Sequence, residues 1–375
     1  MYFKTCHECG LEQQVNPVAG RYRALCSQCD GVLISYRPGF SERGLGFALA
    51  GLVMLFLSAV FPFLSLEIAG RSQNMTLFSG LETVWGQGYE FLALVIGLMV
   101  LVLPAVLLLL IVYFLLLFRW MYKAPSHSAW VGHVLEWFTN WNMADVFLIG
   151  VLVSLVKLSS MASVYPGLSF IAYSCFCICL VGALSTLDHH QLEEWQDQES
   201  EGYSEEYSNP KAMLQRCWAL LFTAVICFIP ANILPVTITT SVGQTYPGTI
   251  LDGVIVLWGM GSYPVASVIF IASIFVPVAK ILALTYLFSS VQFGMEGRQR
   301  ERTTIYRLTE FFGRWSMIDV FVVAMLVSLV QFNNIVAFYA GPAVYAFLAV
   351  VVLTMLAAEC FDPRLIWADS QRKTA

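Results

Sequence analysis

Four cysteines near the start of the chain have the type and spacing that bind metals. Cys6, Cys9, Cys26 and Cys29 form two Cys-x-x-Cys pairs with sixteen residues between them. This spacing is typical of four-cysteine zinc sites. Four thiolates complete the tetrahedral coordination of Zn²⁺, so we predict one zinc ion with a structural role. Cys-x-x-Cys pairs also occur in thiol redox proteins, and a membrane redox protein is the alternative for these residues.

The segment that carries these cysteines, residues 1–43, is expected to form a zinc ribbon in the cytoplasm. A module this short cannot bury a core of its own, so metal binding would supply much of its folding free energy. Thiols stay reduced in the cytoplasm, which favours metal ligands over disulfides. The other six cysteines lie in or beside apolar segments, where a thiol behaves as a small apolar side chain.

A second group of candidates consists of polar side chains inside apolar segments. Ionisable groups are costly in a membrane and are functional candidates by default. Lys280 lies in the middle of one segment, and Asp319 opens the next. We expect the two to approach one another in the inner half of the membrane, either as a proton or conformational relay or as a fixed pair that joins two helices. The other predicted members of this polar network are Asp145, Ser316, Asn232 and Lys157.

Simpler roles stay open for three of these residues. Asp145 lies where a carboxylate could cap a helix, and Lys157 is placed to extend toward outer lipid headgroups. Pro230 and Pro235 flank Asn232 and are expected to break its helix. Broken helices are frequent at transport sites, but prolines also make plain packing kinks.

The composition shows that these residues must be positioned by membrane helices. Of 375 residues, 58% are hydrophobic and only 12% are charged, whereas soluble domains carry about 25% charged residues. The net charge of −5 disfavours nucleic-acid binding. Helices are predicted because hydrocarbon offers no partner for free backbone groups. The segments long enough to span a bilayer are 44–66, 90–118, 143–161, 167–187, 216–237, 264–290, 317–336 and 340–358.

Lysine and arginine predict the orientation. They are concentrated before the first segment, in alternate loops and at the chain end, whereas the opposite loops contain almost none. By the positive-inside rule, both termini are cytoplasmic. Between paired segments on the outer side, Val236–Thr240 is rich in β-branched residues and is followed by glycine and proline, which predicts a small exoplasmic β element.

The chain also repeats itself. Trp141-Asn142-Met143-Ala144-Asp145 recurs as Trp315-Ser316-Met317-Ile318-Asp319, and Pro104 matches Pro277. Each half has four segments, so the halves would be parallel repeats. The predicted fold is therefore an all-α polytopic membrane protein of two parallel four-helix repeats. Its predicted parts are the ribbon 1–43, the modules 44–188 and 214–362, an acidic cytoplasmic linker 189–213, and a cytoplasmic tail 363–375.

Motifs of common enzymes are absent from the sequence. It contains no Walker A, Gly-x-Ser-x-Gly, His-Glu-x-x-His or kinase signature. No enzymatic activity and no nucleotide are therefore predicted.

Several of these motifs resemble the paraquat-inducible protein A family. The cysteine pairs, the duplicated module, Pro230-Ala231-Asn232-Ile233-Leu234-Pro235 and Gly313-Arg314-Trp315-Ser316-Met317-Ile318-Asp319 carry the resemblance over nearly the whole chain. Within the family, the chain looks most like the inner-membrane A component of a lipophilic envelope-spanning tunnel. The family's polar membrane residues match Asp145, Lys280, Ser316 and Asp319. Relatives usually have a second four-cysteine ribbon between the halves; here an acidic linker replaces it, so a single zinc ion is expected.

The resemblance implies a function and a partner. A member of this family would pass phospholipids between the bacterial inner membrane and a periplasm-spanning tunnel protein built from MCE domains. The alternative is a passive membrane anchor that assembles and positions the tunnel protein without moving lipid.

Overall fold

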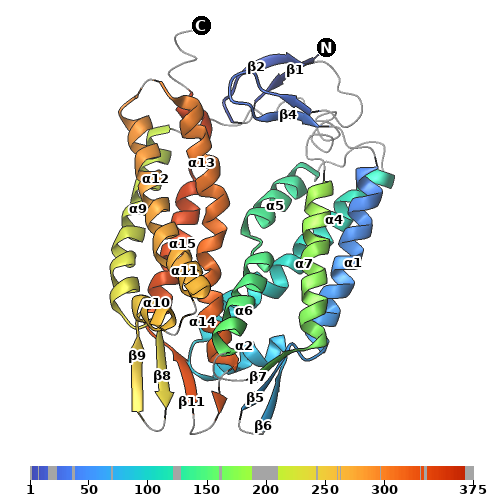
Figure 1. Ribbon diagram of the computed structural model, residues 1–375. Helices are drawn as coiled ribbons and strands as arrows, with labels where there is room; N and C mark the ends of the chain where they lie inside the picture. The colour runs from blue at the N-terminus through green and yellow to red at the C-terminus, as the bar shows by residue number, and fades with distance from the viewer. Residues whose placement is uncertain are drawn as a thin grey trace.

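The computed structural model describes residues 2–187 and 210–367, except for 7, 16–22, 36–38, 69–70, 121–127, 160–162, 242–243, 260, 262, 296, 330 and 333–335. A bundle of apolar helices forms the middle of the molecule, and β structure lies at both ends (Figure 1). The end that holds the N-terminus carries two hairpins. Their strands are β1 (Tyr2–Thr5), β2 (Glu12–Val15), β3 (Arg23–Leu25) and β4 (Val32–Ser35).

The first half of the bundle runs from α1 to α7. Its elements are α1 (Phe40–Val60), β5 (Leu64–Ile68), β6 (Arg71–Met75), α2 (Leu77–Gly86), α3 (Glu90–Gly97), the π-helical turn η1 (Leu98–Val102), α4 (Leu103–Trp120), α5 (Ser128–Trp141), α6 (Ala144–Ser159), β7 (Ser163–Pro166) and α7 (Leu168–Thr186).

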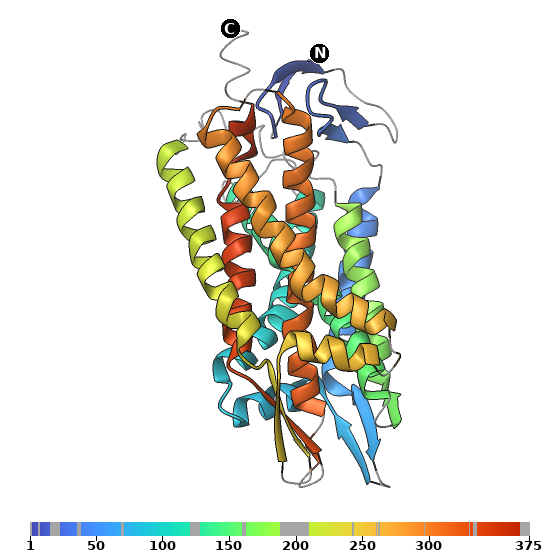
Figure 2. The ribbon, with the colours of Figure 1, turned by 60° about the vertical axis from the view of Figure 1, so that its left-hand side comes forward.

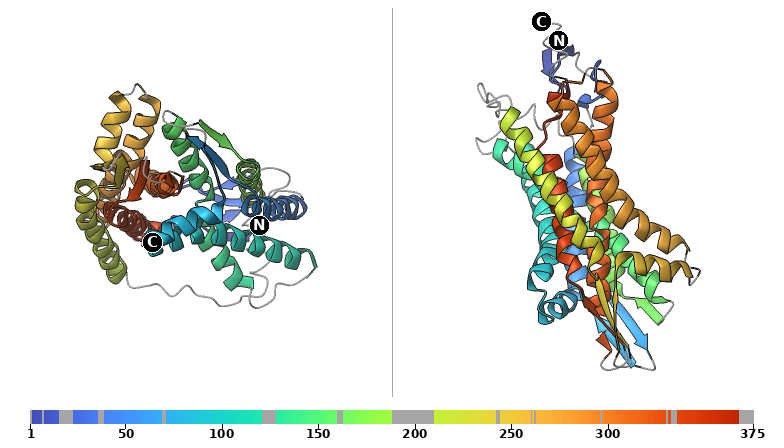
Figure 3. Two further views of the ribbon diagram at one scale, coloured as in Figure 1. Left: turned by 90° about the horizontal axis from the view of Figure 1, so that it is seen from below. Right: turned by 90° about the vertical axis from the view of Figure 1, so that its left-hand side faces the viewer.

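The second half has nearly the same order of elements. They are α9 (Pro210–Ile233), β8 (Thr237–Ser241), β9 (Gln244–Gly248), α10 (Ile250–Gly259), α11 (Tyr263–Phe270), the π-helical turn η2 (Ile271–Phe275), α12 (Val276–Gln292), α13 (Gln299–Gly313), the 3₁₀ turn η3 (Arg314–Met317), α14 (Ile318–Leu329), β10 (Gln331–Phe332), β11 (Val336–Ala340), α15 (Ala343–Glu359) and the 3₁₀ turn η4 (Pro363–Ile366). Seen along the long axis, α9 and α10–α12 lie on one side of the molecule, and α1 and α7 lie on the other (Figure 3).

Six runs of helix within the described residues are long and apolar enough to cross a membrane. These runs are Phe40–Val60, Glu90–Trp120, Trp130–Val156, Leu168–Thr186, Pro210–Ile233 and Ala266–Gln292. They overlap the first six predicted segments. On α9, Phe222, Ile226, Ile229 and Ile233 are all exposed, as expected for a helix that faces lipid.

The last two predicted segments hold shorter helices. α14 has 12 residues and α15 has 17, whereas about 20 are needed to span a bilayer. α14 ends at Leu329 because the chain then enters β10 and β11, which belong to a sheet. Eight spans therefore remain a prediction.

A proline widens the long second helix in each half of the bundle. Pro104 and Pro277 lack the N–H that would continue the normal ladder, and their rings crowd the carbonyl group four residues earlier. The helix widens just before each proline, so that Leu103 N–H donates to Leu98 O and Val276 N–H donates to Ile271 O. These widened turns are η1 and η2, and Figure 2 shows α11, η2 and α12 as one long tilted helix.

Two antiparallel sheets lie at the end of the bundle opposite the N-terminal hairpins (Figure 1). Their strand orders are β6-β5-β7 and β10-β11-β8-β9. The β element predicted at Val236–Thr240 is β8, which pairs with β9. Gly167 and Gly341 lie at matching places just before the last helix of each half. A Cβ on either would overlap the carbonyl oxygen of Pro62 or Pro235, so only glycine fits.

The prediction that prolines break the fifth segment was wrong for Pro230. α9 continues through Pro230 to Ile233 and ends before Pro235. The Asn232 side chain donates to Phe228 O at 2.9 Å, one turn back along the same helix. This bond adds a side-chain link across the turn that contains the proline, so the helix tolerates Pro230 here.

The two halves pack together through α6 and α14. The rings of Phe147 and Phe321 meet edge to face with centroids 5.5 Å apart, and Ser154 Oγ donates to Val322 O at 3.5 Å. Gly150 allows this close approach, because a Cβ there would lie 3.0 Å from the Cβ of Phe321. One continuous buried cluster therefore includes residues from both halves.

Gly150→Leu tests this packing. The added side chain has no space, and overpacking of this kind costs about 1–3 kcal/mol. We expect a lower midpoint of thermal unfolding in detergent than for the unchanged protein. Gly46→Leu is the matched control, because nothing lies within 4 Å of a Cβ built on that helical glycine. Equal midpoints for the two variants would contradict the packing through α6 and α14.

Candidate functional site

The four N-terminal cysteines lie in two turns of the same geometry. In the first turn, Gly10 N–H donates to Cys6 O at 2.8 Å, and in the second, Asp30 N–H donates to Cys26 O at 3.0 Å. Gly10 has φ +71° and Asp30 has φ +58°, so both turns close through a left-handed residue. Each turn follows a strand and leads into its hairpin partner. The hairpins thus present two equivalent cysteine pairs to one another.

The four sulfur atoms converge on one point. All lie within 4.8 Å of one another, and the four residues are buried. The two turns are in direct contact: Cys6 Sγ lies 3.5 Å from Cys29 Sγ, and Cys9 Sγ lies 3.5 Å from Cys26 Sγ. A tetrahedral ion with metal–sulfur bonds of about 2.3 Å separates its ligands by about 3.8 Å. The cluster is therefore compatible with a structural metal.

The thiols have different proton affinities. Burial raises the pKa of Cys9 to about 12 and also raises the pKa of Cys29 well above its usual range. Burial acts in the same direction on Cys26, but hydrogen bonds from the backbone N–H groups of Cys29 and Gln28 lower its pKa to about 7. Four thiolates at these distances would repel one another strongly, so a central cation is needed for all four to lose their protons.

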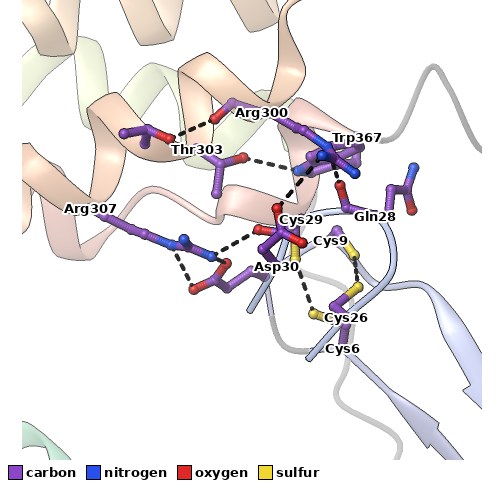
Figure 4. Close-up of polar contacts among 12 residues, drawn as sticks. Cys6, Cys9, Cys26, Gln28, Cys29, Asp30, Arg300, Thr303, Arg307 and Trp367 are labelled. Atoms are coloured by element: carbon purple, nitrogen blue, oxygen red, sulfur yellow. Dashed lines mark hydrogen bonds and ion pairs between the residues drawn. The ribbon is translucent and has the colours of Figure 1, made fainter. Parts of the chain in front are cut away.

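The cysteine turns dock on α13, which belongs to the second half of the bundle (Figure 4). Arg307 Nε donates to Glu8 Oε1 at 3.0 Å, and its Nη2 pairs with the other carboxylate oxygen of Glu8. Nη2 also donates to Cys29 O at 3.2 Å. One guanidinium group thus contacts both cysteine turns. The hydrogen bonds to Glu8 raise the pKa of Arg307.

A second arginine extends the same contact. Arg300 donates to Gln28 O at 2.8 Å and to Ser27 O at 3.1 Å, and its Nη1 lies 3.6 Å from Asp30 Oδ2. Apolar side chains lie beneath these bonds, since the four cysteines share one buried cluster with Leu284, Phe288 and Trp367. The ribbon therefore packs on the half of the chain that is farther from it in sequence.

A cavity of about 270 Å³ lies next to this contact. Its walls come from the end of α5 in the first half and from α12, α13 and α15 in the second half. Lys280 lines the cavity and is only 4% exposed, and its Nζ has no hydrogen-bond partner among the described residues. A Cβ on Gly313 would lie 2.9 Å from Nζ, so glycine leaves room for the ammonium group.

Trp141 is one of the residues that line this cavity. Its Nε1 donates to Glu359 Oε2 at 3.2 Å, which joins α5 of the first half to the end of α15. Glu310 and Glu359 both line the cavity and are exposed, whereas Lys280 is buried. The cavity thus has carboxylates near solvent and a single amine in its depth.

The other predicted network residues are distributed differently. Ser316 is 1% exposed in η3, and its Oγ has no hydrogen-bond partner within the described part of the chain. Asp145 lies in the first turn of α6, and one of its oxygens is likewise unpartnered there. Asn232 bonds its own helix and joins none of the described contacts of Lys280.

Two predictions fall outside the described residues. Asp319 is the second residue of α14 and Lys157 lies near the end of α6, but neither side chain is among those described. The predicted pairing of Lys280 with Asp319 therefore stays a prediction. Most of the predicted acidic linker, residues 189–213, also lies outside the described range, and α9 already begins at Pro210.

Sequence reasoning missed the residues that join the ribbon to the cavity. Glu8 lies inside the first Cys-x-x-Cys pair, which was a usable signal, but Arg307 is one of several arginines in a basic loop. Trp141 and Glu359 come from helices far apart in the chain. Only the packing of α5 against the second half brings these two residues together.

The metal centre can be tested by removing one ligand. Cys26→Ser should abolish stoichiometric metal binding, measured by elemental mass spectrometry on the purified full chain. The ribbon should then exchange its amide hydrogens faster, because a bound metal would supply much of the folding free energy of so short a module. Cys360→Ser is the control, since that thiol is exposed and outside the cluster. Retention of metal by Cys26→Ser would contradict a four-sulfur site.

The docking of the ribbon can be tested at Arg307. Arg307→Ala removes three charge-assisted hydrogen bonds from a half-exposed site, at a cost of about 1–2 kcal/mol. We expect faster hydrogen exchange in residues 2–35 while the bound metal is retained. Arg119→Ala is the control, because its ion pair with Glu42 is exposed and contributes little. Unchanged exchange in Arg307→Ala would show that the arginine does not hold the ribbon.

Comparison with known proteins places these features in a family. The family model described as paraquat-inducible protein A matches the chain twice, at residues 42–198 and 214–371. The intermembrane transport protein PqiA of Escherichia coli K12 is 34% identical over 96% of this chain and 94% of its own length. A probable intermembrane transport protein of Haemophilus influenzae is 28% identical over 98% and 96%.

The lipophilic envelope-spanning tunnel protein A of E. coli K12 is 27% identical over 97% of this chain and 91% of its own length. Its sequence identity to this chain is lower than the 34% found for PqiA. No solved structure matches the chain. These relatives are named as transport proteins and not as enzymes, and together with the six apolar helices they indicate a multi-pass membrane protein. The chain belongs to the paraquat-inducible protein A family.

Proposed function

We propose that this chain is the inner-membrane component of an intermembrane lipid transport system. In this system it passes phospholipid between the inner membrane and a periplasm-spanning partner built from MCE domains. The names of the relatives support intermembrane transport, and the name of one of them includes an envelope-spanning tunnel. Similarity over nearly the full length of these proteins supports a shared activity.

The observation that carries this proposal is the cavity between the halves. A passive anchor has no need for a cavity of about 270 Å³ with a buried lysine that has no hydrogen-bond partner among the described residues. Buried ionisable groups inside membrane proteins usually mark a pathway for ions or substrates. A site between two similar halves can open when one half moves against the other. The cavity is therefore a candidate place for a lipid to enter.

The proposed orientation puts the ribbon in the cytoplasm and the two sheets in the periplasm. Both termini are then cytoplasmic, and the sheets are free to meet the tunnel partner. The concentration of arginine and lysine in the loops on the ribbon side supports this orientation. The matching order of elements in the halves, with a π-helical turn before Pro104 and before Pro277, supports two parallel copies of one module.

The proposed metal is a single Zn²⁺ with a structural role. Four sulfur ligands leave no open coordination position for a substrate or a water, so the site suits folding and not hydrolysis. Zn²⁺ also has no redox chemistry. The convergence of all four buried sulfur atoms within 4.8 Å of one another supports a metal site over a thiol redox role.

The proposed polar network consists of Lys280, Asp319, Ser316 and Asp145. A change in protonation or pairing of Lys280 and Asp319 would accompany opening of the module. Lys280 faces a cavity that contacts both halves, which supports a role in coupling their movement. Asn232 and Lys157 are peripheral members, since Asn232 bonds its own helix.

A complementation assay distinguishes a lipid transporter from a passive anchor. In a bacterial strain that lacks its own proteins of this family, Lys280→Ala and Asp319→Ala should reduce lipid delivery to the outer membrane to about a tenth or less, while the tunnel partner still co-purifies. Lys211→Ala, at an exposed site at the start of α9, is the control. Full delivery by both network variants would refute the relay. Loss of partner binding together with delivery would instead favour the anchor.

A further inference from the structure

Lys280 lies in the depth of the cavity, and none of the described side chains pairs with its ammonium group. Lys280 Nζ is buried and has no hydrogen-bond partner among the described residues. The other cation at the cavity, Arg307, is already engaged by Glu8 and by Cys29 O. A buried ammonium group without a partner is unfavourable unless an anion or water reaches it. The site therefore has chemistry that attracts an anion.

The cavity is large enough for more than water. One water requires about 10–15 Å³ of such space, whereas the cavity measures about 270 Å³. Gly313 leaves the space beside Nζ open, because a Cβ there would lie 2.9 Å from it. Thr309 and Trp141 also line the walls, with their polar hydrogens donated to Ile305 O and Glu359 Oε2, so their polar groups border the same space as the ammonium group. These groups suit a small polar anion better than an acyl chain.

The charges near the mouth limit which anion fits. Glu310 and Glu359 line the cavity and are exposed, and Trp141 orients Glu359 through the bond from its indole N–H. Two carboxylates repel a free phosphate dianion that approaches from solvent, but they attract a positively charged group. A phosphodiester joined to an amine satisfies both ends: the phosphate lies near Lys280 and the amine lies near the carboxylates.

We propose that this cavity binds the phosphate of an amine-bearing phospholipid headgroup, with Lys280 as the residue that contacts the phosphate. This inference rests on the proposed lipid transport and adds the class of lipid to it. The first half has no equivalent site, because Leu107 occupies the corresponding position three residues after Pro104 and is fully buried. Headgroup binding is therefore a property of the second half and its contact with α5.

Binding can be measured on the purified full chain in detergent. The probe is dihexanoyl phosphatidylethanolamine below its micellar concentration. Two comparison ligands are dihexanoylglycerol, which has the same chains without phosphate, and inorganic phosphate. We expect saturable binding of the phospholipid that is at least tenfold tighter, about 1.4 kcal/mol, than binding of either comparison ligand. Equal binding of dihexanoylglycerol would refute phosphate recognition, and equal binding of inorganic phosphate would refute a lipid as the source.

Substitutions then test whether Lys280 is the residue that contacts the phosphate. Lys280→Met should weaken phospholipid binding at least tenfold, and Lys280→Arg should retain most of it. Leu107→Met, the matched change in the first half, should leave binding unchanged. Removing a buried charge in favour of an apolar side chain of similar length is not expected to unfold the protein, and the metal content checks this. Unchanged binding by folded Lys280→Met would overturn the proposal. The lipid-delivery assay is independent, so transport can survive that result.

Discussion

Peptide groups in an apolar environment must find their hydrogen-bond partners within the protein, and the whole bundle depends on this constraint. It makes every apolar segment a helix and confines the strands to the two ends of the bundle (Figure 1). Where Pro104 removes one donor, the helix widens and Tyr173 Oη donates to Val100 O, the carbonyl four residues before the proline, at 3.4 Å. Among the buried side-chain atoms that the structure describes, one polar atom each of Lys280, Ser316 and Asp145 has no hydrogen-bond partner.

The two halves have the same frame but different chemistry. In the first half, Tyr173 is fully buried and bonds the widened turn, and Leu107 packs in the core. At the corresponding places, the second half has Phe347, which has no hydroxyl group, and Lys280. Two halves with nearly the same order of elements thus differ in chemistry: the first has apolar packing at this place, and the second has a buried lysine that lines a cavity. The contact through Gly150 and Phe321 holds the two halves together.

Arg307 connects the cysteine cluster to the cavity. Its guanidinium group contacts both cysteine turns of the ribbon, and the residue also lines the space that contains Lys280. The folded state of a domain at one end of the bundle is therefore linked, through one helix, to the site between the halves. The four buried sulfur atoms of the ribbon converge on one point, and the arginines of α13 bond the turns that carry them.

The sequence by itself determined the features that depend on local pattern. The spacing of Cys6, Cys9, Cys26 and Cys29 predicted their cluster, apolar runs predicted the six long helices, and β-branched residues predicted β8. Only the tertiary structure decided the docking of the ribbon on α13, the continuation of α9 through Pro230, and the enclosure of Lys280 by helices from both halves. The reason is physical: periodicity and spacing act over a few turns of chain, whereas Trp141 meets Glu359, and Glu8 meets Arg307, only through packing that no local pattern encodes.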